Sequence, residues 1–247
     1  MLYISHKESS NKRSRFPYAH IVTFTSIVFV AFLNLYSVSV QNGLLEMITK
    51  PLIMLSIGGY FLYSIKNRKP QNSKTIVAYT LLAFAFSWLG DIFLLFSEKS
   101  LHYFLLGIFS FFCSQVLYII LFKKLTYKNL NIRKLGLYPL PFLIYFIGFY
   151  SLLWSELETV FKVAVFIYAL SLSTMGVAAL SRFQRSNKQS FVLVLVGGGL
   201  FILSDSCIAY SKFIESFANA GVVIMFTYIL AQIFIMLGIK SFLFHSN

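Results

Sequence analysis

Long apolar segments recur along the whole chain, and they limit its possible folds more than any other feature. The first runs from Tyr18 to Val40, and a transmembrane helix needs about 20 residues. Seven further segments of similar length follow, at residues 47–65, 75–97, 101–122, 135–154, 159–180, 189–210 and 217–240. The pattern predicts an all-α membrane protein with eight transmembrane helices, made of a basic tail at residues 1–17 and a single helical domain over residues 18–243.

The composition excludes most other classes of protein. Only 12% of the 247 residues are charged and 58% are hydrophobic, whereas soluble domains carry about 25% charged and 45–50% apolar residues. An ordinary soluble enzyme, a disordered protein and a coiled coil are therefore ruled out. The first apolar segment follows basic residues, as in a signal peptide, but it is longer than a typical signal core of about 7–15 residues. We expect a retained helix, with cleavage after the small residues Ser37 to Ser39 as the alternative.

The distribution of basic residues predicts the orientation in the membrane. Lys and Arg concentrate on the cytoplasmic side of membrane proteins. With eight spans, the N-terminal tail, the even-numbered connectors and the C-terminus hold 17 of the 21 Lys and Arg residues and one acid, Glu8. We therefore expect both termini in the cytoplasm of a multi-pass protein of the bacterial inner (plasma) membrane. The net charge of +13 then reflects contact with the lipid bilayer, and nucleic acid is not expected as a partner. The opposite side holds Lys50, Lys99, Lys162, Lys212 and five glutamates.

A weak internal repeat accompanies this topology. The segments LGDIF around Asp91 and LSDSC around Asp205 are 114 residues apart, and Lys50 and Lys162 are 112 apart. The third span would then match the seventh, and the second the sixth. Such spacing suggests two four-helix halves in parallel orientation, as in several membrane transporters.

Asp91 and Asp205 are the two acids that fall inside the predicted spans. A carboxylate in hydrocarbon is costly, so an intramembrane acid indicates a functional site by default. Both spans run toward the outside, and at 1.5 Å per residue each Asp lies roughly 8–9 Å below the outer edge. We expect a shared polar cavity in the outer half of the membrane. The alternative is that the two acids only join helices through structural polar contacts.

Other polar residues are candidates to support the two acids. Asn34 lies at a similar depth, and Ser87 precedes Asp91 by four residues, a spacing at which helical side chains meet. Lys50 starts the second span and would meet a buried Asp or a lipid phosphate, or would extend to the interface. Ser204 and Ser206 flank Asp205, and would favour its ionised form. Five more residues at helical spacing would line the deeper part of the pocket or form ordinary interhelical hydrogen bonds: Gln115, Tyr118, Tyr168, Tyr228 and Gln232.

The usual signatures of hydrolases and metalloenzymes are missing. The chain has no G-x-S-x-G, H-E-x-x-H or Walker A motif, and its histidines are scattered at residues 6, 20, 102 and 245. Cys113 and Cys207 lie in apolar segments and are expected to be packing residues. We therefore expect neither a metal nor a cofactor, and a site built on two carboxylates.

Several motifs together resemble the YhhN family, which contains membrane lysoplasmalogenases. They are FSWLGDIFLLF, FILSDSCIAYSKF, TKPL at 49–52, and the pairs Tyr168/Met175 and Tyr228/Gln232. The resemblance implies eight spans and hydrolysis of the vinyl ether bond of a lysoplasmalogen, which yields a fatty aldehyde and glycerophosphocholine or glycerophosphoethanolamine. It places Asp91 and Asp205 at the family's two acidic positions and Lys50 at its KP lysine. Where many members have HxxY, this chain has Gln115 to Tyr118.

The chemistry of a vinyl ether agrees with two carboxyl groups. Protonation at carbon gives an oxocarbenium ion that water captures, so the site needs one protonated acid and one anion, a division also used by glycosidases. We expect Asp91 to be the acid, desolvated by Phe84 and Trp88 and oriented by Ser87. An intramembrane aspartyl protease is a weaker match, because WLGD lacks the first glycine of GxGD and no PAL triplet occurs. A small-solute or proton-coupled transporter that uses the same acids is the alternative from another class.

Overall fold

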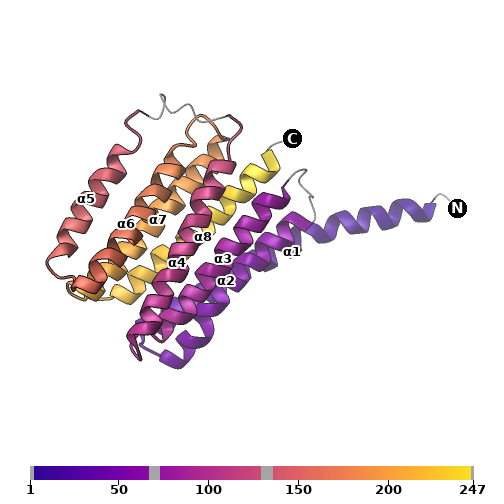
Figure 1. Cartoon of the computed structure of the whole chain (residues 1–247). Helices are drawn as coiled ribbons and strands as arrows, with labels where there is room; N and C mark the ends of the chain where they lie inside the picture. Colours follow the sequence, from indigo (N-terminus) through magenta and orange to yellow (C-terminus); the bar gives the residue numbers. More distant parts are fainter. Residues whose placement is uncertain (1–2, 67–72, 129–135, 246–247) are drawn as a thin grey trace.

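The structure is a computed structural model that describes residues 3–66, 73–128 and 136–245, with side chains from residue 20 onward apart from residue 160. The described part forms eight α helices and no strand (Figure 1). Their bounds are α1 Tyr3–Ser39, α2 Gly43–Lys66, α3 Lys74–Leu95, α4 Leu101–Lys124, α5 Leu140–Trp154, α6 Thr159–Leu180, α7 Lys188–Phe213 and α8 Ala220–His245.

The helices follow the predicted spans closely, with two differences. Seven helices of the described part are long and apolar enough to cross a membrane, and α5 is shorter, at 15 residues. Its length is about 22 Å, less than the roughly 30 Å hydrocarbon core of a bilayer. Pro139 and Pro141 stand at its start, and proline is favoured in a first helical turn, so the helix begins at Leu140 rather than at residue 135. The second difference is α1, which begins at Tyr3 within the predicted tail and projects beyond the bundle (Figure 1).

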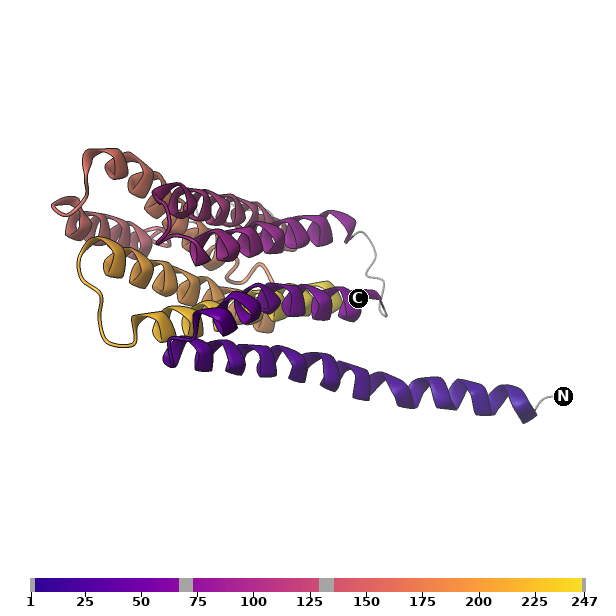
Figure 2. The ribbon, with the colours of Figure 1, turned by 90° about the horizontal axis from the view of Figure 1, so that it is seen from below.

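The two chain termini emerge from the same end of the bundle, which we call the terminal end (Figure 2). It also holds the C-terminal ends of α2, α4 and α6. The opposite, short-loop end holds residues 40–42, 96–100, 155–158 and 214–219. All helices run between these two ends, α5 included. Four basic residues used in the orientation argument, Arg68, Lys69, Arg133 and Lys134, lie outside the described residues.

The helix contacts repeat in the two halves of the chain. Consecutive helices α1 to α4 pack side by side, as do α5 to α8, and α4 contacts α6 just as α8 contacts α2. Tyr118 of α4 and Gln232 of α8, which are 114 residues apart, meet at the centre through a hydrogen bond of 2.6 Å. This pattern supports the two four-helix halves suggested by the aspartate motifs.

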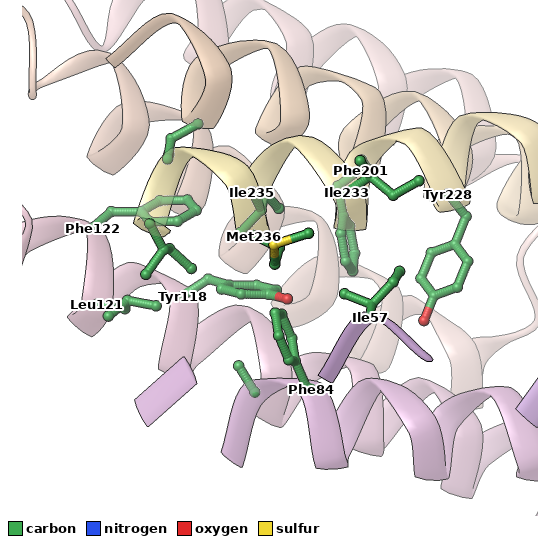
Figure 3. Packing of buried hydrophobic residues seen from close by; sticks show 14 of the residues in the cluster. Ile57, Phe84, Tyr118, Leu121, Phe122, Phe201, Tyr228, Ile233, Ile235 and Met236 are labelled. Atoms are coloured by element: carbon green, nitrogen blue, oxygen red, sulfur yellow. The ribbon is translucent and has the colours of Figure 1, made fainter. Parts of the chain in front are cut away.

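The main core surrounds α8, which packs on α1, α2 and α7 and meets α3 and α4 through side chains. Ile57, Phe84, Tyr118, Phe201 and Met236 point into this space from five of these helices (Figure 3). Close approach of α7 and α8 requires glycine at residue 197, since a Cβ atom there would lie 2.9 Å from the Ala231 carbonyl oxygen. The core therefore fixes α3, α4, α7 and α8, the helices that carry most of the site.

A buried arginine ties the helices together at the terminal end. The sequence placed Arg182 in a cytoplasmic connector, but its side chain has no exposed surface. It donates to the carbonyl oxygens of Leu125 and Ser190, both at 3.1 Å, and to the Ser186 and Ser190 hydroxyls. Burial lowers the pKa of Arg182 to about 9, so the guanidinium remains charged at neutral pH. Backbone carbonyls and hydroxyls solvate this charge, and the end of α4 is thereby joined to α6 and α7.

Candidate functional site

Asp91 lies near the short-loop end of α3 and is 2% exposed. The hydroxyl of Tyr228, from α8, donates to its Oδ2 atom at 2.8 Å. The ammonium group of Lys50, at the start of α2, is close enough to interact with it electrostatically. This carboxyl is therefore held by one hydrogen-bond donor and one nearby cation.

Asp205 occupies the matching place on α7 and is 4% exposed. Its Oδ2 atom accepts two hydrogen bonds, from the Tyr168 hydroxyl at 2.5 Å and from Gln115 Nε2 at 3.1 Å. Ser171 donates to the amide oxygen of Gln115, which turns the amide nitrogen toward Asp205. Since both donors bind Oδ2, Oδ1 is left without a hydrogen bond from the described residues.

The two carboxyls are within electrostatic range of each other, although α3 and α7 are not neighbours. Aromatic rings separate them. Phe111 packs edge-to-face on Tyr228 and on Phe201, with ring centroids 5.8 and 6.2 Å apart. The arrangement brings the predicted pair together in one region of the bundle but places a wall between them.

A narrow cavity of about 40 Å³ adjoins only one of the carboxyls. Asp205 and Tyr168 supply its polar groups, and Asp91 is absent from its lining. Its other walls are apolar side chains of α3, α4, α6 and α7: Leu94, Phe104, Ile108, Phe111, Val165, Ile208, Ala209 and Phe213. Both acids do not share this cavity: Phe111 is one of its walls, and the same ring lies against Gly90, the residue before Asp91.

Gly90 explains how that ring fits. A Cβ atom at residue 90 would lie 2.7 Å from the ring of Phe111, well inside van der Waals contact. The glycine of the LGD segment therefore admits the aromatic wall next to Asp91. The sequence offered no signal for this role, since Phe111 is one of 28 phenylalanines in the chain.

The model of the YhhN family matches residues 45–239. The chain belongs to the YhhN family. No curated protein and no solved structure matches it. The match confirms the resemblance seen in the sequence, and it covers both aspartates and every side chain that binds them, while α1 lies outside it.

The YhhN chain does not use Ser87 to orient Asp91, so that expectation is wrong. The Ser87 hydroxyl pairs with the Ser114 hydroxyl at 2.8 Å and accepts from Gln232 Nε2 at 3.0 Å. Gln232 in turn accepts from Tyr118. Gln115, Tyr168 and Tyr228 contact the carboxyls directly, whereas Tyr118 and Gln232 form this separate network. Ser114 was missed, because small hydroxyl residues are common in membrane helices and carry no distinguishing signal.

The serines beside Asp205 also bond elsewhere in this YhhN protein. Ser204 donates to the Ile224 carbonyl oxygen at 3.0 Å, and Ser206 donates to the Ile202 carbonyl oxygen at 2.6 Å. Adjacent residues of a helix do not face each other, so hydroxyls next to an aspartate point away from its carboxyl. Ser204 thereby joins α7 to α8, and the Ser206 hydroxyl also pairs with the Tyr145 hydroxyl of α5 at 2.8 Å. Tyr168 and Gln115 bind Asp205 in their place.

Asn34 and Lys50 lie apart from the cavity. Asn34 is fully buried and donates to the Thr49 hydroxyl at 3.0 Å, which fixes α1 on α2. Lys50 forms an ion pair with Glu46 at 3.5 Å. Among the residues that the structure describes, no group of three or more His, Cys, Asp or Glu side chains could hold a metal ion. The polar groups that the described residues bring together in this YhhN protein are two carboxyls with their phenolic and amide donors.

Proposed function

We propose that this YhhN protein is a lysoplasmalogenase, a membrane hydrolase that cleaves the vinyl ether bond of a lysophospholipid. The products are a fatty aldehyde and glycerophosphocholine or glycerophosphoethanolamine. The observation that carries the proposal is a buried carboxyl, Asp205, which lines a cavity with a second carboxyl in electrostatic range. Vinyl ether hydrolysis needs an acid at the reacting carbon and is favoured by a negative charge nearby, and it requires no serine nucleophile.

We propose further that all eight helices cross the bacterial inner membrane, with both termini in the cytoplasm. Support comes from the terminal end, where both chain termini emerge (Figure 2), and from the excess of Lys and Arg assigned to that side. The short helix α5 runs alongside its longer neighbour α6 (Figure 1). A crossing by α5 makes the number of spans even, as termini on one side require. The carboxyls then lie in the outer half of the membrane.

The proposed reaction begins with proton transfer from a carboxylic acid to the vinyl carbon farther from the ether oxygen. The electron pair of the double bond forms the new C–H bond, and the positive charge is shared between the other vinyl carbon and oxygen. Water adds to that carbon and gives up a proton to the carboxylate formed in the first step. The resulting hemiacetal breaks its bond to the glycerol oxygen, which takes up the hemiacetal proton, and the aldehyde leaves. One water is consumed, and the acid is restored.

We assign the acid to Asp205, because a proton donor must touch the reacting carbon and Asp205 is the carboxyl that lines the cavity. The two donors on Oδ2 hold it so that Oδ1 can carry the proton. Asp91, behind Phe111, would supply a fixed negative charge that stabilises the oxocarbenium ion electrostatically, a contribution that is often large in a site that excludes water. This reverses the assignment made from the sequence, which rested on desolvation of Asp91 by Phe84 and Trp88, on its orientation by Ser87, and on the serines that flank Asp205.

The packing deeper in the bundle favours a hydrolase over a transporter. Tyr118, Leu121 and Phe122 have no exposed surface and pack in the core (Figure 3). They follow Gln115 along α4 toward the terminal end. A transporter needs a route that opens to both sides, whereas a hydrolase needs access from one side. The cavity at Asp205 adjoins the short-loop side of this packed layer.

Purified protein in detergent tests the proposal. We expect aldehyde release from a lysoplasmalogen and none from its saturated ether analogue, because only the vinyl ether can be protonated at carbon. Release from neither compound, together with solute uptake into proteoliposomes, would establish the transporter instead. Boiled protein serves as the control for spontaneous hydrolysis.

A further inference from the structure

One face of α7 connects the cavity to the short-loop end of the bundle. Asp205, Ile208 and Ala209 line the cavity and follow one another at helical spacing, and Phe213 lines it one turn farther on. Lys212, seven residues after Asp205, lies on the same face, since residues i and i+7 are separated by about two turns. The helix therefore presents a carboxyl at one end of the cavity and an ammonium group beyond the other.

Lys212 has a position that suits an anionic ligand. Its side chain is exposed, and its Nζ atom lies 5.1 Å from the centroid of the Phe104 ring. Within the described part of the chain, no carboxylate lies within ion-pair distance of it, whereas Lys50 is paired with Glu46. A single ring compensates a solvent-exposed cation only weakly, so this ammonium remains available to a phosphate.

Three aromatic rings, which we call the aromatic cap, close the cavity beneath Lys212. Phe104, Phe161 and Phe213 contact one another with centroids 5.4 to 6.4 Å apart. Phe104 and Phe213 are also cavity walls. The cap belongs to a small apolar cluster distinct from the main core.

We propose that Lys212 binds the phosphate of the lysolipid head group while the vinyl ether reaches Asp205 beneath the aromatic cap. The inference rests on the proposed function and identifies which end of the substrate the protein recognises. Seven residues of helix separate the two groups by about 10 Å, a distance that a glycerol backbone and a flexible lysine side chain can bridge. The site would therefore prefer a phosphorylated substrate to a neutral alkenylglycerol.

The experiment compares Lys212→Gln with a matched control, Lys99→Gln. Lys99 also lies over a phenylalanine at the short-loop end, 4.9 Å from the centroid of Phe96, but neither residue lines the cavity. For a lysoplasmalogen we expect Lys212→Gln to raise KM about tenfold, equivalent to about 1.4 kcal/mol of binding, with kcat nearly unchanged. The alkenylglycerol should show no change, Lys212→Arg should restore KM, and Lys99→Gln should match the wild type.

Three results would overturn the assignment of Lys212. The first is an unchanged KM of Lys212→Gln for the lysoplasmalogen. The second is an equal rise in KM for both substrates, which would indicate a packing role on Phe104. The third is a rise in KM in Lys50→Gln alone, which would place the phosphate at α2. If the wild type releases no aldehyde, the proposed function fails, and the saturated ether lysophospholipid becomes the probe. If calorimetry shows that Lys212→Gln binds this lipid more weakly than the wild type does, the head-group site is still supported. Equal binding by the two proteins would exclude it.

Discussion

The two carboxyls occupy matching positions in the two halves of the molecule, yet their surroundings differ. Asp205 has donors from α4 and α6 and lines a cavity, whereas Asp91 has one donor from α8 and lies behind the Phe111 ring. The 114-residue repeat shows part of the cause. Gln115, which binds Asp205, corresponds to Ile229, which is buried and apolar and has no donor to offer. Two repeated halves can therefore each keep an acid, while only one half keeps the hydrogen-bond donors and the cavity beside it.

The strongest test of this difference is to remove each acid in turn. We expect Asp205→Asn to lower kcat for aldehyde release at least about 1,000-fold, since asparagine cannot donate the proton, a barrier increase of roughly 4 kcal/mol. Asp91→Asn should cost less, about 100-fold, because it removes an electrostatic contribution and not the proton donor. Steady-state kinetics on protein that elutes as the wild type does on gel filtration gives both values.

The double variant sharpens the same comparison. If the two acids act as a unit, its kcat should be little lower than that of Asp205→Asn alone, because catalytic groups that act together are strongly non-additive. A larger loss in Asp91→Asn than in Asp205→Asn would exchange the two roles. Either single variant that keeps more than a tenth of the wild-type kcat would exclude that residue from the chemistry.

The pH dependence separates the two roles in another way. The wild-type kcat/KM should pass through a maximum, since one carboxyl must be protonated and the other ionised, and its two apparent pKa values belong to the pair. Asp91→Asn should lose the acidic limb, because the group that must be ionised is gone, and should keep the alkaline limb set by Asp205. Rates must be corrected for the acid-catalysed hydrolysis of the free lipid. Persistence of the acidic limb in this variant would contradict the role given to Asp91.

The tyrosines that hold the two acids provide a matched pair of smaller effects. Tyr168→Phe should lower kcat by about tenfold, because the Asp205 carboxyl loses a hydrogen bond that helps to aim it into the cavity. Tyr228→Phe should lower kcat only a few-fold, since Asp91 does not touch the substrate. Equal losses of kcat in the two variants would show that both carboxyls must be placed with the same accuracy. The different roles given to Asp205 and Asp91 would then be wrong.

The sequence alone predicts much of this architecture. The spacing of the apolar segments predicted the helices to within a few residues except at α1 and α5. At α1 the basic tail continues as helix, and at α5 two prolines delay the start of the helix. The intramembrane acids and the YhhN resemblance identified the region of the site. These features are encoded locally, in runs of residues and in motifs, and they are visible without knowing which helices touch.

The surroundings of each acid could not be predicted in the same way. Ser87 lies at the right helical spacing from Asp91, yet it bonds Ser114 and Gln232, because the rotation of α3 is set by its packing on α4 and α8. The wall at Phe111 and the cavity at Asp205 likewise depend on three or more helices at once. Helical periodicity reports which residues share a face, but not which neighbour that face meets.

The smallest predicted effect tests how the wall beside Asp91 is built. Gly90→Ala places a Cβ atom 2.7 Å from the Phe111 ring, so the ring must shift and the bundle should lose about 1–3 kcal/mol of stability, the usual cost of overpacking. Gly199→Ala is the matched control, because nothing lies within 4 Å of a Cβ atom there. Thermal unfolding in detergent should show a lower Tm for Gly90→Ala alone. Its kcat should change only a few-fold, since Phe111 also lines the cavity at Asp205, and adding Phe111→Leu should restore the Tm by making room for the new methyl group. An unchanged Tm in Gly90→Ala would mean that the ring moves freely, and a ring that moves freely cannot keep the two carboxyls in separate surroundings.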